Sequence, residues 1–397
     1  MRISRRAQSV PASPTLAVTA KAKELQAKGI DVVGFGAGEP DFDTPDYIKD
    51  AAIKALKEGK TKYTPAAGIP ELRKAIAEKL KRENNLTYAP EQIVVNIGGK
   101  HSVYEAMQTI LDPGDEVLLP APYWVTYPEA IKLAGAVVKV METDKKNDYK
   151  VTPGQLKKAI TTKKTAMFVL NSPSNPGGFT YTPEELAALA KVLEGTDVWV
   201  MSDEIYEKLI YGKTRFLSFA SLSEDAYRRT LTLNGFSKAF SMTGWRLGYT
   251  AGPLDALKAM ARMQDHMTSN PVTFAQYAAI AALGPQANEA IERMRKEFER
   301  RAAFMAERLN AIGGVECPQP TGAFYCFPDV SAHYGRTIKG TRITGSMVFA
   351  EALLEQANVA LVPGLPFGCD KNVRRSFACS VEQIAKGLDR LEKWLSK

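Results

Sequence analysis

Lys238 lies in a stretch whose residue types suit covalent chemistry beside a bound phosphate. Ser237 comes immediately before it, and Arg246 follows in the same run. A neutral lysine amine can form a Schiff base with a carbonyl compound, while a hydroxyl and a guanidinium suit a phosphate held next to it. The preceding stretch 230–234 is apolar, which predicts a buried strand. We therefore expect Lys238 at the carboxyl end of a strand, where open α/β sheets bind their ligands.

Asp203 and Tyr206 follow a second apolar stretch, residues 198–202. A buried carboxylate can keep the nitrogen of a pyridine ring protonated, which lets that ring accept electrons, and a phenol can hydrogen-bond a ring oxygen. An aspartate after a strand is equally expected as a helix cap, and the motif alone does not decide between these two roles.

Asn175 lies in the loop 172–178, which follows a third apolar stretch, 165–171. A cluster of proline and glycine after a strand is usually only a loop. The position of this loop, one strand unit before Asp203, favours a place in the same site.

These motifs, Asn-Pro-Gly, Asp-Glu-x-Tyr, Ser-Lys and Gly-Trp-Arg-x-Gly in this order, resemble the class I aminotransferases of the fold-type I superfamily, which use pyridoxal 5'-phosphate. The likeness extends over nearly the whole chain, from residues 38–42 through 63–68 to 372–378. Within the family it is strongest to bacterial aspartate aminotransferases, a group that includes aspartate/prephenate aminotransferases. The resemblance implies a homodimer that transfers the amino group of L-aspartate to 2-oxoglutarate by a ping-pong route.

The resemblance also implies a role for each site residue. Lys238 is expected to bind the cofactor covalently and to move the substrate's α-proton. The expected cofactor contacts are Gly99, Lys100, Trp124, Asn175, Asp203, Tyr206, Ser237, Lys238 and Arg246, with Tyr63 contributed by a second subunit. The expected substrate contacts are Gly38, Lys100, Trp124, Asn175 and Arg374. The family pattern further implies cis peptide bonds at Ala121-Pro122 and Asn175-Pro176.

Three of these expectations have support from the residues themselves. Gly98 to His101 open a helix directly after a strand, so free N–H groups there can bind an anion. Trp124 follows the apolar stretch 117–119, which favours a stacking position over the more common place in a core. Arg374 has the planar fork that grips a carboxylate in two places, which a lysine lacks.

The chain departs from the common family pattern at three positions. Arg375 replaces a residue that is usually apolar, and strand alternation should turn its side chain away from Arg374. Ser174 and Gly178 replace an asparagine and a threonine in the loop around Asn175. At Lys100, by contrast, the chain keeps a residue of the subgroup it resembles, and the resemblance implies that this lysine binds the distal carboxylate of a dicarboxylic substrate.

The elements that must position these residues are those of an α/β protein. Apolar runs begin near Ile93, Val117, Val137, Ala166, Val198, Leu231 and Leu247 and alternate with helical patterns. They predict a large, mostly parallel, seven-stranded sheet covered by helices on both faces. After residue 253 the pattern changes to long helices, with one over 288–312, and short strands, which predicts a smaller α+β domain. We expect a large cofactor-binding domain over 47–285 and a small domain made of 1–46 and 286–397.

Composition agrees with an ordinary globular enzyme. The chain has 397 residues, a formal net charge of +8 and no apolar run of membrane-spanning length. Its lysines are spread out instead of forming one stripe, which argues against nucleic-acid binding. The basic N-terminus lacks a secretory pattern, and the four cysteines have no metal-ligand spacing, so we expect a cytoplasmic protein with reduced cysteines and no metal.

The sequence alone is also compatible with other functions. The same scaffold could serve aromatic, prephenate/arogenate or alanine transamination, or a β-lyase, and a regulator with vestigial catalysis would need a DNA-binding or partner-binding module. A nicotinamide-binding protein is disfavoured, because the glycines of 34–38 are followed by Glu39-Pro40-Asp41 instead of a glycine-ended helix start.

Overall fold

The computed structural model describes residues 1–161 and 163–396, and its centre is a seven-stranded sheet. The strand order is β2-β8-β7-β6-β5-β3-β4. The strands are β2 (Ile93–Asn96), β3 (Glu116–Ala121), β4 (Val137–Glu142), β5 (Thr165–Asn171), β6 (Trp199–Asp203), β7 (Thr230–Gly235) and β8 (Gly248–Ala251). All seven predicted strands are present, so the predicted fold class is confirmed.

Only β8 runs against its neighbours, pairing antiparallel with both β7 and β2. The other pairs in the sheet are parallel. The start of β8 therefore lies at the same edge of the sheet as the ends of the other strands. This places Arg246, which precedes β8, beside residues that follow β2, β3, β5, β6 and β7.

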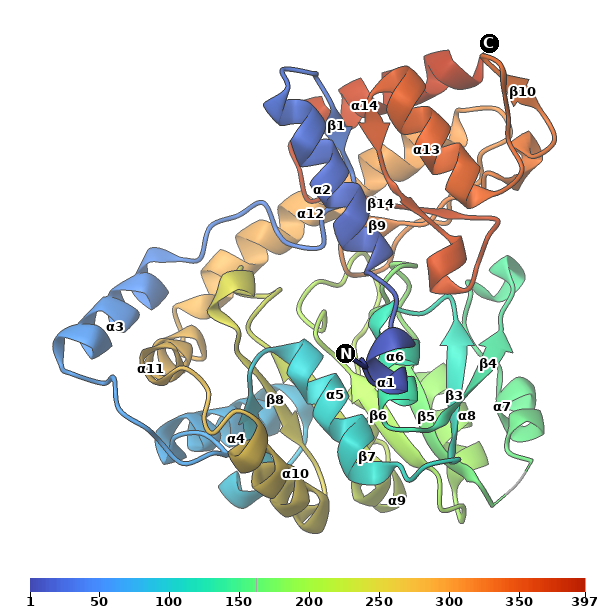
Figure 1. Cartoon of the computed structure of the whole chain (residues 1–397). Coiled ribbons are helices and arrows are strands. Elements are labelled where there is room, and N and C mark those ends of the chain that lie inside the picture. The colour runs from blue at the N-terminus through green and yellow to red at the C-terminus, as the bar shows by residue number, and fades with distance from the viewer. Residues whose placement is uncertain (162, 397) are drawn as a thin grey trace.

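Helices cover both faces of the sheet (Figure 1). The helices of this part are α3 (Asp46–Lys57), α4 (Pro70–Asn84), α5 (Gly99–Ile110), α6 (Thr126–Leu133), α7 (Pro153–Ala159), α8 (Pro183–Leu193), α9 (Glu224–Arg229), α10 (Leu254–Met267) and α11 (Thr273–Ala282). Successive side chains of a strand point to opposite faces. Val117 and Leu119 pack with α5, α6 and α10, whereas Leu118 packs with α8. The edge strand β4 is largely exposed, whereas β7 and β8 are buried throughout.

A second core forms around the C-terminal elements. Its largest sheet is antiparallel, in the order β13-β14-β9. The strands are β9 (Tyr325–Cys326), β10 (Thr337–Ile338), β11 (Thr341–Arg342), β12 (Val359–Ala360), β13 (Val362–Pro363) and β14 (Val373–Ser376), and the helices are α12 (Ala287–Asn310), α13 (Ser346–Ala357) and α14 (Val381–Leu395). Figure 1 shows α12, close to the predicted 288–312, running from beside α11 toward α13 and α14.

The N-terminal segment joins this second core. It carries α1 (Arg5–Gln8), α2 (Pro14–Ala27) and β1 (Val33–Gly34), and β1 pairs in parallel with β12. Phe35 and Val33 are buried among side chains of the C-terminal elements. The exact boundaries proposed for the two domains stay a prediction. In the part of the chain that the structure describes, no helix is both long and apolar enough to cross a membrane.

Candidate active site

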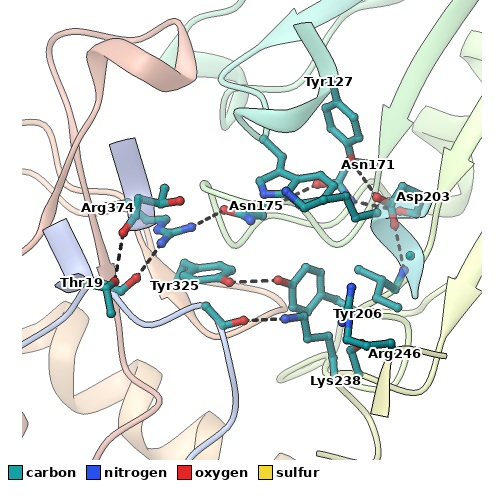
Figure 2. A pocket seen from close by; sticks show the side chains of 18 residues that line it. Thr19, Tyr127, Asn171, Asn175, Asp203, Tyr206, Lys238, Arg246, Tyr325 and Arg374 are labelled. Carbon is teal, nitrogen blue, oxygen red and sulfur yellow. Dashed lines mark hydrogen bonds between the residues drawn. The ribbon is translucent and has the colours of Figure 1, made fainter. Parts of the chain in front are cut away.

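A pocket of about 250 Å³ opens at the carboxyl edge of the large sheet, where the second core meets it. Of the predicted site residues, eleven line it: Gly38, Gly99, Lys100, Trp124, Asn175, Asp203, Tyr206, Ser237, Lys238, Arg246 and Arg374. Figure 2 shows their side chains converging from both parts of the chain. The pocket therefore collects residues that are more than 300 positions apart in the sequence.

Lys238 lies in the turn after β7, and its amine points into the pocket. Its Nζ donates a hydrogen bond to the carbonyl oxygen of Gly38. Burial lowers the pKa of Lys238 to about 8; Glu39 opposes this shift, and Arg374 and Arg246 add to it. Because this pKa lies only about one unit above neutral pH, roughly a tenth of the amine is neutral, and so nucleophilic, at pH 7.

Asp203 ends β6 and is buried, with an exposed fraction of 7%. Its Oδ2 accepts a hydrogen bond of 2.7 Å from the hydroxyl of Tyr127, and its Oδ1 accepts one of 3.2 Å from the Ile205 N–H. Burial raises the pKa of Asp203, while the hydrogen bond from Tyr127 opposes that shift. The carboxylate is thus held by two donors and faces the pocket.

The start of α5 and Arg246 form a concave, positively charged corner. Gly98, the residue before α5, has a φ of +78°, and a Cβ there would lie 2.7 Å from Nη2 of Arg246. Only glycine allows this approach of the guanidinium to the helix start. Because the first N–H groups of a helix have no intrahelical partner, and Ser237 lines the same pocket as Gly99 and Arg246, the corner can bind a phosphate.

Trp124 precedes α6, and its ring meets that of Tyr127 edge to face at 5.4 Å. Lys100 lies over the same tryptophan, with its Nζ 4.8 Å from the ring centroid, and donates to Thr126 Oγ1 at 2.9 Å. The start of α6 therefore fixes both an aromatic platform and a cation at the pocket.

Arg374 lies on β14 and is buried, with an exposed fraction of 2%. Its guanidinium is packed between the rings of Tyr325 and Phe367, at 4.5 and 5.2 Å from their centroids. It donates to Asn175 Oδ1 at 2.9 Å and to the Gly36 carbonyl oxygen at 3.0 Å. Its Nε has no hydrogen-bond partner among the described residues. This rigid, desolvated cation is suited to a carboxylate.

Tyr63 is the one predicted site residue that lies away from this pocket. It is 90% exposed on the surface of the chain. A role for Tyr63 in the pocket of a second copy stays a prediction, as do the individual roles of the other site residues.

Sequence reasoning assigned no role to several residues that line the pocket: Thr19, Gly36, Tyr127, Asn171, Ile205 and Tyr325. Tyr127 comes three residues after Trp124, so helical spacing could have suggested a shared face. Tyr325 is hydrogen-bonded to Tyr206 at 2.9 Å between their hydroxyl oxygens, across 119 residues of sequence. No local signal points to such a pair.

The loop around Asn175 keeps its predicted form. Both peptide bonds expected to be cis, Ala121-Pro122 and Asn175-Pro176, are cis, and Ser172-Pro173 is a third. Asn175 N–H donates to Asn171 Oδ1 at 2.9 Å. Gly178 has a φ of +67°, and a Cβ there would lie 2.4 Å from the Tyr325 carbonyl oxygen, so the threonine common in the family would not fit.

The residues present fit the pyridoxal 5'-phosphate that the resemblance implies. The corner of Gly98 and Arg246, with Ser237 in the same pocket, offers donors and positive charge for the phosphate. Asp203 offers a buried carboxylate for the ring nitrogen, and Lys238 offers an amine of lowered pKa for the aldehyde. These side chains thus match the phosphate, the ring nitrogen and the aldehyde of that cofactor.

Comparison with known proteins gives a consistent result. Residues 30–391 match the family described as aminotransferase class I and II. The chain is 49% identical to the aspartate aminotransferase of Geobacillus stearothermophilus, with 100% of this chain and 99% of the relative covered. It is 47% identical to a probable aspartate/prephenate aminotransferase of Aquifex aeolicus, with the same coverage.

Solved structures agree. A crystal structure of the aspartate aminotransferase from Rhizobium meliloti superposes with a TM-score of 0.95 at 40% identity, covering 100% of this chain and 99% of that one. The aspartate aminotransferase from Thermus thermophilus with maleate gives a TM-score of 0.93 at 44% identity, covering 99% and 100%.

Proposed function

The chain belongs to the class I and II aminotransferase family, and from that premise we propose that it transfers the amino group of L-aspartate to 2-oxoglutarate with pyridoxal 5'-phosphate as its cofactor. The observation that carries the proposal is the meeting of three groups in one pocket. These are the amine of Lys238, whose pKa is lowered to about 8, the buried carboxylate of Asp203 and the phosphate corner at Arg246.

When bound, the cofactor supplies an aldehyde for the amino group and an electron-accepting ring. The protein's part is to bind, orient and move protons. Asp203 would keep a proton on the ring nitrogen, and Nζ of Lys238 would take the proton from the substrate's α-carbon. The lowered pKa of Lys238 suits that task near neutral pH.

Substrate orientation falls to Arg374 and Lys100. Arg374 can bind the α-carboxylate in two places, because the rings of Tyr325 and Phe367 fix its plane. Lys100, held over Trp124 by Thr126, supports recognition of a second carboxylate. The Thermus relative was solved with maleate, which is a dicarboxylate, and several curated relatives are named aspartate aminotransferases. These points favour aspartate and glutamate over alanine, aromatic substrates or a β-lyase reaction.

The proposed active unit is a homodimer. Tyr63 is almost fully exposed although it is aromatic, and Ile53, Leu56 and Val272 are also exposed apolar residues. Exposed apolar side chains of this kind favour contact with a second copy, in which Tyr63 would reach the phosphate corner. The cytoplasmic location expected from the N-terminus stays a prediction.

The test is a coupled assay of oxaloacetate formation from aspartate and 2-oxoglutarate by the purified protein supplied with cofactor. We expect activity with aspartate that is lost in Lys238→Ala. Equal rates with alanine or phenylalanine would overturn the dicarboxylate assignment, and release of ammonia and pyruvate would indicate a lyase.

A further inference from the structure

Tyr127 makes the shortest hydrogen bond to Asp203 in the pocket, although the sequence assigned it no role. It lies in the first turn of α6, is 1% exposed, and its hydroxyl is 2.7 Å from Asp203 Oδ2. Figure 2 shows the ring directed at the carboxylate from the side opposite Lys238. The contact joins residues 76 positions apart, so it is a tertiary feature and not a consequence of local geometry.

The direction of this hydrogen bond follows from the chemistry of the two groups. An ionised carboxylate only accepts, so the phenol donates. Burial and the neighbouring Asp203 charge raise the pKa of Tyr127 well above its usual value, which keeps its proton in place. Tyr127 is therefore a permanent donor to Asp203.

The other groups facing Asp203 do not replace that donor. The Ile205 N–H binds Oδ1 at the longer distance of 3.2 Å. Lys238 favours the ionised carboxylate through its charge, but it comes from a separate turn and its hydrogen bond goes to Gly38. Tyr206 bonds to Tyr325. Burial alone would favour the protonated form of Asp203, so a donor to Oδ2 shifts the balance toward the carboxylate.

The same ring also contacts the aromatic platform. Tyr127 meets Trp124 edge to face, with the ring planes at 87°. One side chain thus lies against both the group expected to stack on the cofactor ring and the group expected to bind its nitrogen. A phenylalanine would keep the first contact and lose the second.

We propose that Tyr127 is a positioning residue that keeps Asp203 ionised and aimed at the ring nitrogen of the cofactor, so that the proton of this pair stays on the nitrogen. The inference rests on the proposed function, because it concerns the same cofactor. The ring of Tyr127 packs against Trp124, whereas its hydroxyl, through Asp203, keeps the proton on the ring nitrogen.

The test compares Tyr127→Phe with the wild-type protein after both are loaded with pyridoxal phosphate carrying ¹⁵N in the ring. We expect the ¹⁵N resonance of the variant to move toward the value of the unprotonated ring, for which Asp203→Ala supplies the reference. Loss of a hydrogen bond to a charged group should also raise the dissociation constant for the cofactor by roughly tenfold.

Tyr123→Phe is the matched control, since it removes a phenol hydroxyl from the loop just before α6, on the side that packs against Gly368. Its ¹⁵N resonance should equal that of the wild type. If Tyr127→Phe does not fold, 3-fluorotyrosine at position 127 keeps the shape and strengthens the donor, and should shift the resonance toward the protonated ring. A wild-type protein that binds no cofactor would end the proposed function, whereas a resonance unchanged in both Tyr127 variants would end this inference alone.

Discussion

Gly98 and Arg246 lie so close that a side chain on the glycine would displace the guanidinium of the arginine. A Cβ on Gly98 would be 2.7 Å from Nη2 and 2.9 Å from Cζ of the arginine, and the backbone there has a φ of +78° and a ψ of 162°, which is essentially restricted to glycine. The phosphate corner depends on this contact between the residue before α5 and an arginine two positions before β8.

Gly98→Ala should therefore weaken cofactor binding. The new methyl group displaces the guanidinium, and the strained backbone adds a cost of about 1–3 kcal/mol. We expect the dissociation constant for pyridoxal phosphate to rise by roughly tenfold or more, as measured by absorbance titration of the apoprotein. Gly154→Ala, in α7 with open space around it, is the control and should bind normally. Equal affinities of the two variants would contradict the role of the corner.

The reactivity of Lys238 should follow its lowered pKa. Only the neutral amine attacks an aldehyde, and burial brings the pKa of Lys238 to about 8. The rate at which the apoprotein captures pyridoxal phosphate should rise about tenfold per pH unit below that value and level off above it. Stopped-flow absorbance measures this rate. A rate that keeps rising into the range of an ordinary lysine would show that the amine is not desolvated.

Arg375 should be replaceable with a gain in stability. It is fully buried, none of its three guanidinium nitrogens has a hydrogen-bond partner among the described residues, and it lies 4.2 Å from the centroid of the Phe35 ring. Burial lowers its pKa to about 10, so its charge is costly. Because a methionine of similar volume carries no charge, Arg375→Met should be neutral or raise the free energy of unfolding by about 1–4 kcal/mol in urea titrations.

The matched comparison is Arg301, a buried arginine that is paired. It forms ion pairs of 2.8 Å with Asp41 and with Glu297. Arg301→Met removes hydrogen bonds to two partly exposed carboxylates and should lower the free energy of unfolding by about 1–3 kcal/mol. A loss of stability in Arg375→Met as large as in Arg301→Met would mean that Arg375 has a partner that the packing does not reveal.

Subunit complementation tests whether Tyr63 acts across a dimer. Lys238→Ala and Tyr63→Ala are each expected to be impaired. If Tyr63 serves the pocket of the second copy, a hybrid of the two variants contains one site with both native residues, and mixing after denaturation should restore activity. No restoration in a mixture that does form hybrids, as judged with two affinity tags, would show that Tyr63 does not cross.

The sequence predicted the parts of the site that follow strands. Lys238, Asp203 and Asn175 each come after an apolar run, and parallel strands bring such residues to one edge. The separation of Arg374 from Arg375 was also predictable, because alternation along β14 sends one to the pocket and the other to the core.

Other contacts could not be predicted, because they depend on tertiary packing. The bond from Tyr127 to Asp203 requires α6 to lie against the end of β6, and the pair of Tyr206 and Tyr325 requires the two cores to meet. Arg374 reaches the Gly36 carbonyl across 338 residues. Hydrophobic periodicity defines elements but not which remote side chains they bring together.

The most direct test of the account is the absorbance spectrum of the purified protein loaded with pyridoxal phosphate, recorded before and after adding single amino acids without an acceptor. We predict that aspartate and glutamate convert the pyridoxal band to that of pyridoxamine phosphate, that alanine and phenylalanine do so far less, and that Lys100→Met reduces this preference. Conversion by alanine or phenylalanine as readily as by aspartate would contradict the dicarboxylate assignment, and the absence of any bound-cofactor band would contradict the enzyme assignment itself.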